Sequence, residues 1–185
     1  MQIHKRKAGF TLIELLVVIA VVGVLAGAII VVINPSEQFA RAHDAARKNN
    51  IRQLGEAIVA NVAIRGTYQV PGGNWMDTLK GAGELKAVPQ EITPRPSNVL
   101  CWDWTYQNNY CYYAQAYGAS GQVQAWVWTN VESKTEMNKC GVTISSLYQG
   151  PYYVYDTINN KTCLKCLSDQ GSNSWAFAGA CHPGE

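Results

Sequence analysis

A run of nineteen residues without a polar side chain, Leu15 to Ile33, constrains this chain more than any other feature. The basic cluster Lys5-Arg6-Lys7 precedes it. As a helix, Phe10 to Ile33 would be roughly 36 Å long, enough to cross a hydrocarbon core of about 30 Å. Lipid favours a helix because each backbone polar group must be satisfied within the segment. The positive-inside rule then keeps residues 1–9 in the cytoplasm and exports the C-terminal side.

Glu14 is the one carboxylate in this apolar segment. An ionised carboxylate costs roughly 2.5–3.5 kcal/mol at the centre of a membrane span and less near its edge. Glu14 therefore either lies at the level of the lipid headgroups or meets an opposite charge. We favour the second interpretation, since ionisable residues inside membrane spans usually serve a function.

The residues Ala8-Gly9-Phe10-Thr11-Leu12-Ile13-Glu14, with the apolar residues that follow, resemble the class III signal of type IV pilins and pseudopilins. The resemblance implies that a prepilin peptidase cleaves after Gly9 and N-methylates Phe10. It also implies that Glu14 neutralises the N-terminal amine of a neighbouring subunit during assembly. Glycine suits the cleavage site because it lets a protease approach the backbone closely. A buried amine and carboxylate each reduce the desolvation cost of the other.

Two other interpretations of the N-terminus remain open. Ala26-Gly27-Ala28 is similar to a secretory cleavage site, which would leave a soluble chain beginning at Ile29. Glu14 and the apolar residues after Ala28 speak against it. The segment could also be an uncleaved anchor, in which Gly23 and Gly27 form a G-x-x-x-G helix-packing pattern.

A second helical segment follows at residues 34–66. Pro35 disfavours helix at Asn34, so either a new helix begins at Pro35 or one long helix is kinked there. An apolar stripe predicts packing on a globular domain: Ile51, Leu54, Ile58 and Val62. Gly66 is a plausible helix cap. Interleaved charges predict a solvated face or pairing between subunits: Arg41, Arg47, Lys48 and Arg52 with Glu37, Asp44 and Glu56.

Residues 67–185 form the expected exported domain, which holds every cysteine and tryptophan. A loop containing Tyr68-Gln69-Val70-Pro71 is followed by a short helix within 75–85 and an extended segment, 89–96. Alternating patterns predict an antiparallel hairpin of strands 109–117 and 122–131, with a third strand at 151–157. The predicted fold is α+β: a long N-terminal helix packed on a small antiparallel sheet with disulfide-closed loops. This is the pilin-like architecture that the resemblance implies.

The even cysteine count fits an oxidising compartment. Cys101 and Cys111 can form a local disulfide, whereas Cys140, Cys163, Cys166 and Cys181 allow three pairings. We expect Cys140–Cys163 and Cys166–Cys181. Zinc binding by Cys163, Cys166, Cys181 and His182, or a redox pair at Cys163-x-x-Cys166, is a less favoured alternative to structural disulfides.

No catalytic motif is present in the sequence, so we predict no enzyme activity, cofactor or metal. Asp156 and Asp169 could bind calcium, but we favour the interpretation that they are solvated loop carboxylates. Several aromatic residues could form a stacking surface or pack the sheet: Trp102, Trp104, Trp126, Trp128, Tyr110, Tyr112 and Tyr113. Leader removal takes three of the 15 Lys and Arg and leaves twelve against 13 Asp and Glu. That balance speaks against nucleic-acid binding.

The expected function is therefore structural: a subunit of a type IV pilus-like filament, made as a prepilin and polymerising through its N-terminal helix. Its expected partners are the prepilin peptidase, copies of itself and other pilins, the inner-membrane assembly machinery, and lipid before assembly. We expect a single-pass membrane protein that later joins a surface or periplasmic filament. The alternatives are a type II secretion pseudopilin and, more distantly, a membrane-anchored extracellular binding module.

Overall fold

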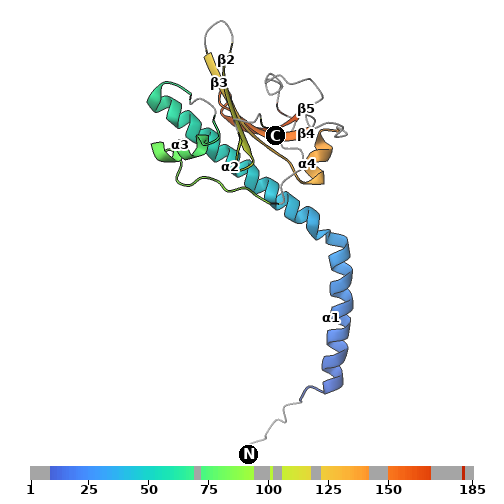
Figure 1. Cartoon of the computed structure of the whole chain (residues 1–185). Helices are drawn as coiled ribbons and strands as arrows, with labels where there is room; N and C mark the ends of the chain where they lie inside the picture. Colours follow the sequence, from blue (N-terminus) through green and yellow to red (C-terminus); the bar gives the residue numbers. More distant parts are fainter. Residues whose placement is uncertain are drawn as a thin grey trace, which may run out of the picture. The chain divides into compact units, whose positions relative to one another are not determined.

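The structure is a computed structural model that describes residues 9–68, 72–93, 101, 106–117, 122–141, 150–167 and 181. Its contacts divide the chain into two compact units, Met1–Phe39 and Ala40–Glu185. Within the described residues, four helices and five strands follow one another (Figure 1), in the order α1-α2-α3-β1-β2-β3-α4-β4-β5.

The first unit contains α1, Leu12–Ile33, which begins at a capping box. The Thr11 side chain accepts a hydrogen bond from the Glu14 N–H, and the Glu14 side chain accepts one from the Thr11 N–H. This reciprocal pair satisfies two backbone donors that the first turn would otherwise leave free. The helix ends at Asn34, whose φ of 47° lies in the left-handed region.

The second helix, α2, spans Pro35–Arg65. Of the two alternatives for the Asn34-Pro35 step, the structure therefore has a new helix beginning at Pro35. Proline suits this first position because its missing N–H needs no partner there. At the other end, Gly66 has a φ of 75° and its N–H donates to the Val62 carbonyl at 2.8 Å, which confirms the predicted cap.

The sheet has the strand order β1-β2-β3-β4-β5, with every neighbouring pair antiparallel. The strands are Tyr106–Gln107, Tyr110–Tyr117, Gln122–Asn130, Gly150–Asp156 and Lys161–Leu167. The predicted hairpin is confirmed, with Ala114 opposite Ala125, and so is the third predicted strand as β4. Strands β1 and β5 and the short helix α4, Lys134–Lys139, were not predicted.

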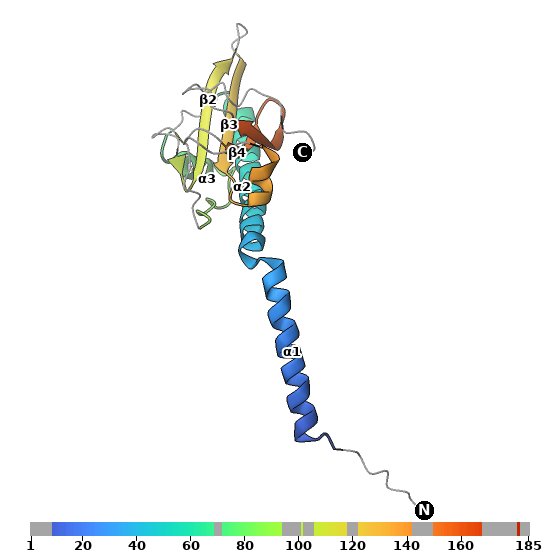
Figure 2. The same cartoon turned by 90° about the vertical axis from the view of Figure 1, so that its right-hand side faces the viewer.

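One face of the sheet packs against α2 and α3, Trp75–Ala82. Figures 1 and 2 show α2 running along this face. The predicted apolar stripe is buried there: Ile51, Leu54 and Ile58 contact the same core as Tyr112 and Val127. The α+β, pilin-like fold class is thus confirmed.

The opposite face of the sheet holds a second buried cluster. The strand registers align Cys111, Trp128, Val154 and Cys163 in one row across β2, β3, β4 and β5. Trp126 and Tyr152 flank this row and are equally buried. Each face of this small sheet therefore carries a buried cluster of side chains.

The structure joins Cys101 to Cys111, as expected, but it joins Cys140 to Cys166 and Cys163 to Cys181. The predicted Cys140–Cys163 and Cys166–Cys181 pairing is wrong. Cys163 and Cys166 are three residues apart on β5, and side chains an odd number of residues apart point to opposite faces of a strand. Cys140 packs against the core on the helix side, so it meets Cys166, while Cys163 lies in the row on the opposite face.

Several sequence predictions concern residues outside the described ranges: the basic leader, residues 69–71 and 94–96, Trp102, Trp104, Asp169 and His182.

Candidate functional site

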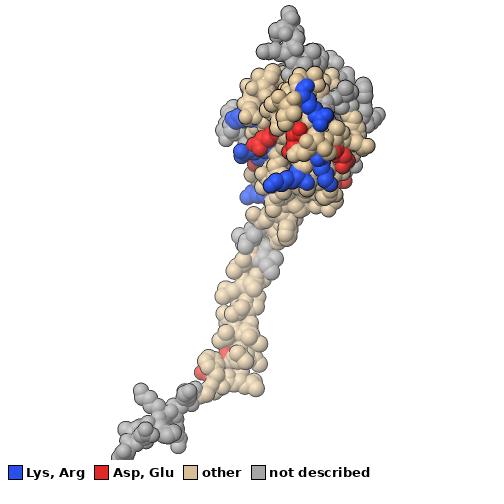
Figure 3. Space-filling model, turned by 90° about the vertical axis from the view of Figure 1, so that its left-hand side faces the viewer, with Lys and Arg blue, Asp and Glu red and all other residues tan. Residues whose placement is uncertain are grey.

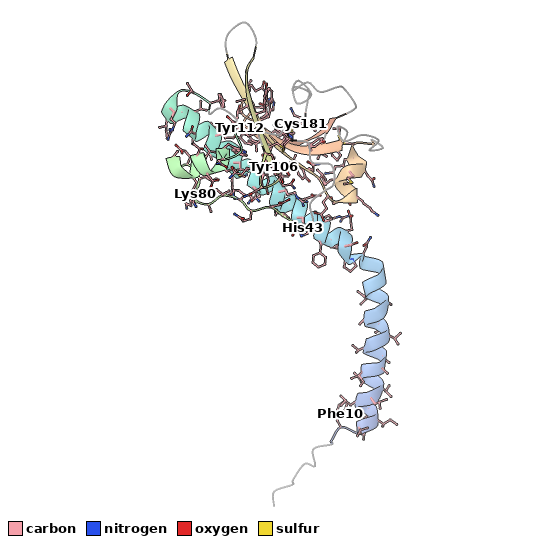
Figure 4. All side chains as sticks on the ribbon, viewed as in Figure 1. Phe10, His43, Lys80, Tyr106, Tyr112 and Cys181 are labelled. Atoms are coloured by element: carbon pink, nitrogen blue, oxygen red, sulfur yellow. A yellow bond between two sulfur atoms is a disulfide. The ribbon has the colours of Figure 1, made fainter. Side chains whose placement is uncertain are left out.

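The predicted processing site lies just before α1. Gly9, Phe10 and Thr11 are exposed and outside any helix or strand, and nothing lies within 4 Å of a Cβ built on Gly9. Figure 4 shows Phe10 beside the start of α1. Among the described residues, the Gly9–Phe10 peptide bond is thus in open backbone that a protease can bind in an extended form.

Glu14 is directed toward the same end of α1. Its Oε2 accepts hydrogen bonds from the Thr11 N–H at 2.9 Å and the Thr11 hydroxyl at 2.7 Å. The positive end of the helix dipole also favours a carboxylate at this position. The structure therefore places Glu14 in contact with Thr11, the residue directly after Phe10. It also gives Glu14 an intrachain partner, Thr11, that the sequence analysis did not anticipate.

The surface of α1 is apolar on all sides. The segment Leu12–Ile29 has a mean hydropathy of 2.8 and none of it is buried within the protein. On the face drawn in Figure 3, α1 shows no Lys or Arg, and acidic atoms lie only near its N-terminal end. An exposed apolar surface of this extent needs lipid or other apolar helices to cover it.

A buried group of charges connects the early turns of α2 with the start of α4 in the second unit. Arg47 donates to Asp44 at 3.1 Å and to Glu132 at 2.7 Å. Only 1% of Arg47 and 2% of Asp44 is exposed. The Asp44 carboxylate also accepts from the backbone N–H groups of Glu132 and Ser133, both at 2.8 Å. His43 (labelled in Figure 4) completes the group, with Nδ1 3.1 Å from Glu132.

This cluster corrects the expectation of a solvated charged face on α2. Arg52 and Glu56 do form an exposed pair, at 2.8 Å, but Asp44 and Arg47 are structural. The Ser133 side chain accepts from the Glu136 N–H and begins α4. That Ser-x-x-Glu spacing is a capping signal in the sequence, and it could have located the start of α4.

Among the described residues, the less favoured alternatives for the aromatic residues, the cysteines and Asp156 find little support. Trp126, Trp128, Tyr110 and Tyr112 are buried in the two cores, so they pack the sheet and offer no stacking surface. Cys163 and Cys166 are in different disulfides, which removes the thiolates that zinc binding or a redox pair would need. Asp156 is buried at the end of β4, not a solvated loop carboxylate as expected. It accepts hydrogen bonds from Gln124, the Ile158 N–H and Asn159 and thereby orders the turn that follows.

Comparison with known families bears on the N-terminus. Residues 4–30 match the prokaryotic N-terminal methylation motif. This is the class III signal peptide of type IV pilins and pseudopilins, and with the pilin-like fold it supports that family. The motif implies processing by a prepilin peptidase and assembly into filaments, and it fits a single-pass membrane anchor. No curated protein and no solved structure matches the chain.

Proposed function

We propose that the chain is the precursor of a structural subunit of a type IV pilus-like filament. Cleavage after Gly9 gives a mature chain that begins with N-methylated Phe10. Residues 10–33 then anchor the subunit in the membrane and later form the core of the filament, while residues 67–185 are exported. Glu14 pairs with the N-terminal amine of a neighbouring copy. The chain has no catalytic role.

The observation that carries this proposal is the combination of the motif with an uncovered apolar helix. Within α1, Glu14 is the one acidic residue and no basic residue accompanies it. Cleavage would create a cation at Phe10, four residues before Glu14 in the sequence. In lipid or in a bundle of apolar helices, two such charges on adjacent copies offset part of each other's desolvation cost, which an unpaired charge would bear in full.

The first test is the mass of the mature N-terminus in a sheared surface fraction and in membranes. The proposal expects a chain beginning at N-methylated Phe10, enriched in the sheared fraction. A chain beginning at Ile29 would point to a secreted protein, and an uncut chain to a plain anchor. Either result would overturn the proposal.

The second test separates assembly from helix capping. Glu14→Gln and Glu14→Ala should reach the membrane but lose filaments. Thr11→Val is the matched control, because it removes the hydroxyl that Glu14 accepts from and leaves the carboxylate in place. Losing that capping contact costs about 1 kcal/mol, and the Thr11→Val chain should still assemble. Equal loss of filaments in all three variants would mean that Glu14 acts only as a cap.

We favour a pilin over a type II secretion pseudopilin because residues 67–185 build a bulky, aromatic and disulfide-rich domain. Deleting the gene should then remove surface filaments and leave the secreted proteins of the cell unchanged. Loss of secretion with surface filaments intact would instead assign the chain to a secretion system.

A further inference from the structure

The turn between β4 and β5 carries a motif that the filament function does not use. Asn160-Lys161-Thr162 is an Asn-x-Thr sequence without proline at the middle position, the acceptor pattern for N-linked glycans. Asn160 is exposed at the end of this turn, with a φ of 49° in the left-handed region. Ile158, two residues earlier, is also exposed, so this turn lies at the surface of the protein.

The side-chain amide of Asn160 is oriented by one neighbour. The Tyr155 hydroxyl donates a hydrogen bond to Asn160 Oδ1. Among the described residues, Asn160 Nδ2 makes no hydrogen bond. In the folded chain this contact engages the oxygen only, so a glycan on the nitrogen would displace no hydrogen bond of that atom to a described residue.

A groove of about 560 Å³ lies beside this amide, between α2 and the β4–β5 turn. Asn160 itself lines it, together with Lys48, Asn49 and Arg52 of α2 and with Tyr155 of β4. Amide and charged side chains can hydrogen-bond to sugar hydroxyls, while the Tyr155 ring is buried beneath them and adds no exposed surface. The groove thus fits the first sugars of a chain attached at Asn160.

We propose that Asn160 is N-glycosylated after export and that the proximal sugars lie in this groove. Asn160 Nδ2 attacks the anomeric carbon of a saccharide carried on a polyprenyl phosphate or diphosphate. The N–C bond forms, the bond from that carbon to the phosphate oxygen breaks, Nδ2 loses one proton, and the lipid phosphate leaves. A membrane oligosaccharyltransferase catalyses the step. This proposal rests on the proposed function in one respect only: both require that the globular domain is exported.

The fold also sets the time of transfer. Thr162 pairs with Tyr155 in the β4–β5 ladder, and its hydroxyl is buried with no hydrogen-bond partner among the described residues. A transferase that reads this hydroxyl must act before β5 pairs with β4. Glycosylation therefore precedes closure of this hairpin.

The test is intact-mass analysis of the full-length chain purified from the cells that naturally make it, followed by electron-transfer dissociation of the peptide containing Asn160. The wild-type chain should be heavier, by at least one sugar residue located on Asn160, than the processed sequence defined by the N-terminal mass of the same sample. Asn160→Gln and Thr162→Val should lose this mass completely. Thr162→Ser retains the motif and should keep the mass. The neighbouring Asn159→Gln, which lies outside the motif, should keep it too.

An unmodified Asn160 in the wild-type chain would overturn the proposal, and so would the same added mass in Thr162→Val. Detection of all three disulfides in each variant confirms that its domain has folded. The N-terminal mass of the same samples reports signal cleavage separately, so failure of glycosylation and failure of the filament function are distinguishable.

Discussion

At the scale of single residues, Gly55 of α2 lies in close contact with the Tyr155 ring of β4. A Cβ built on Gly55 would lie 2.1 Å from Cδ1 of the Tyr155 ring, far inside van der Waals contact. Because Gly55 has a hydrogen in place of a Cβ atom, α2 can pack this closely against the sheet. The spacing of apolar residues predicted the buried stripe of α2. It could not predict this contact, because the contact depends on the distance between the helix and the sheet.

Gly55→Ala should therefore lower the free energy of unfolding by about 1–3 kcal/mol, the usual cost of overpacking a core. Gly81→Ala is the matched control, since a Cβ there meets nothing within 4 Å and alanine favours helix by up to about 1 kcal/mol. Urea unfolding of the full chain in detergent, followed by tryptophan fluorescence, measures both. Equal stability of the two variants would contradict the close contact.

The buried charges of α2 give a second prediction at this scale. Asp44→Ala removes one of the two carboxylate partners of the buried Arg47. It should lower the free energy of unfolding by about 3–5 kcal/mol. Glu56→Gln breaks the exposed ion pair with Arg52 and should lower the free energy of unfolding by less than about 1 kcal/mol. The same unfolding measurement compares them. A small loss for Asp44→Ala would mean that water reaches the cluster.

At the scale of elements, the sequence predicted α1, α2, α3, β2, β3 and β4 but not β5. The β5 sequence, Lys161–Leu167, mixes lysines and cysteines and so lacks a clear apolar alternation. In the fold, Lys165 is nonetheless buried, and burial lowers the pKa of its ammonium group. Once β5 is known, its two faces determine which cysteine meets which partner. Without β5 the pairing could not be read from the sequence.

The disulfide pairing can be tested by freeing one thiol. Cys140→Ser should expose a single reactive thiol at Cys166, identified by alkylation and peptide mass mapping. The pairing expected from sequence alone would expose Cys163 instead. Loss of the bridge should also lower the free energy of unfolding by about 3 kcal/mol, because the unfolded chain gains the entropy of an open loop.

At the scale of the whole molecule, buried tyrosines make stability depend on pH in the alkaline range. Burial raises the pKa of Tyr152 to about 12 and raises the pKa values of Tyr110 and Tyr112 above the usual 10. Each group holds its proton more tightly in the folded state than in the unfolded state. Its stabilisation is therefore fully present below pH of about 10 and is lost as the pH rises through the folded pKa.

The free energy of unfolding should consequently fall between pH of about 10 and 12, and Tyr152→Phe should make that fall less steep. Urea titrations across this range measure it, with phenolate absorbance recorded in parallel. Titration of all ten tyrosines near their usual pKa with the fold intact would contradict the prediction.

The crossed disulfides have a mechanical consequence. Residues 140 and 181 are 41 positions apart, yet the covalent path through both bridges follows the backbone only from 166 to 163. A pulling force that unravelled this region would gain almost no length while the bridges hold. After reduction, the same region could extend by about 130 Å at roughly 3.4 Å per residue. The stretch between Cys140 and Cys181 is thus nearly inextensible while both bridges are oxidised.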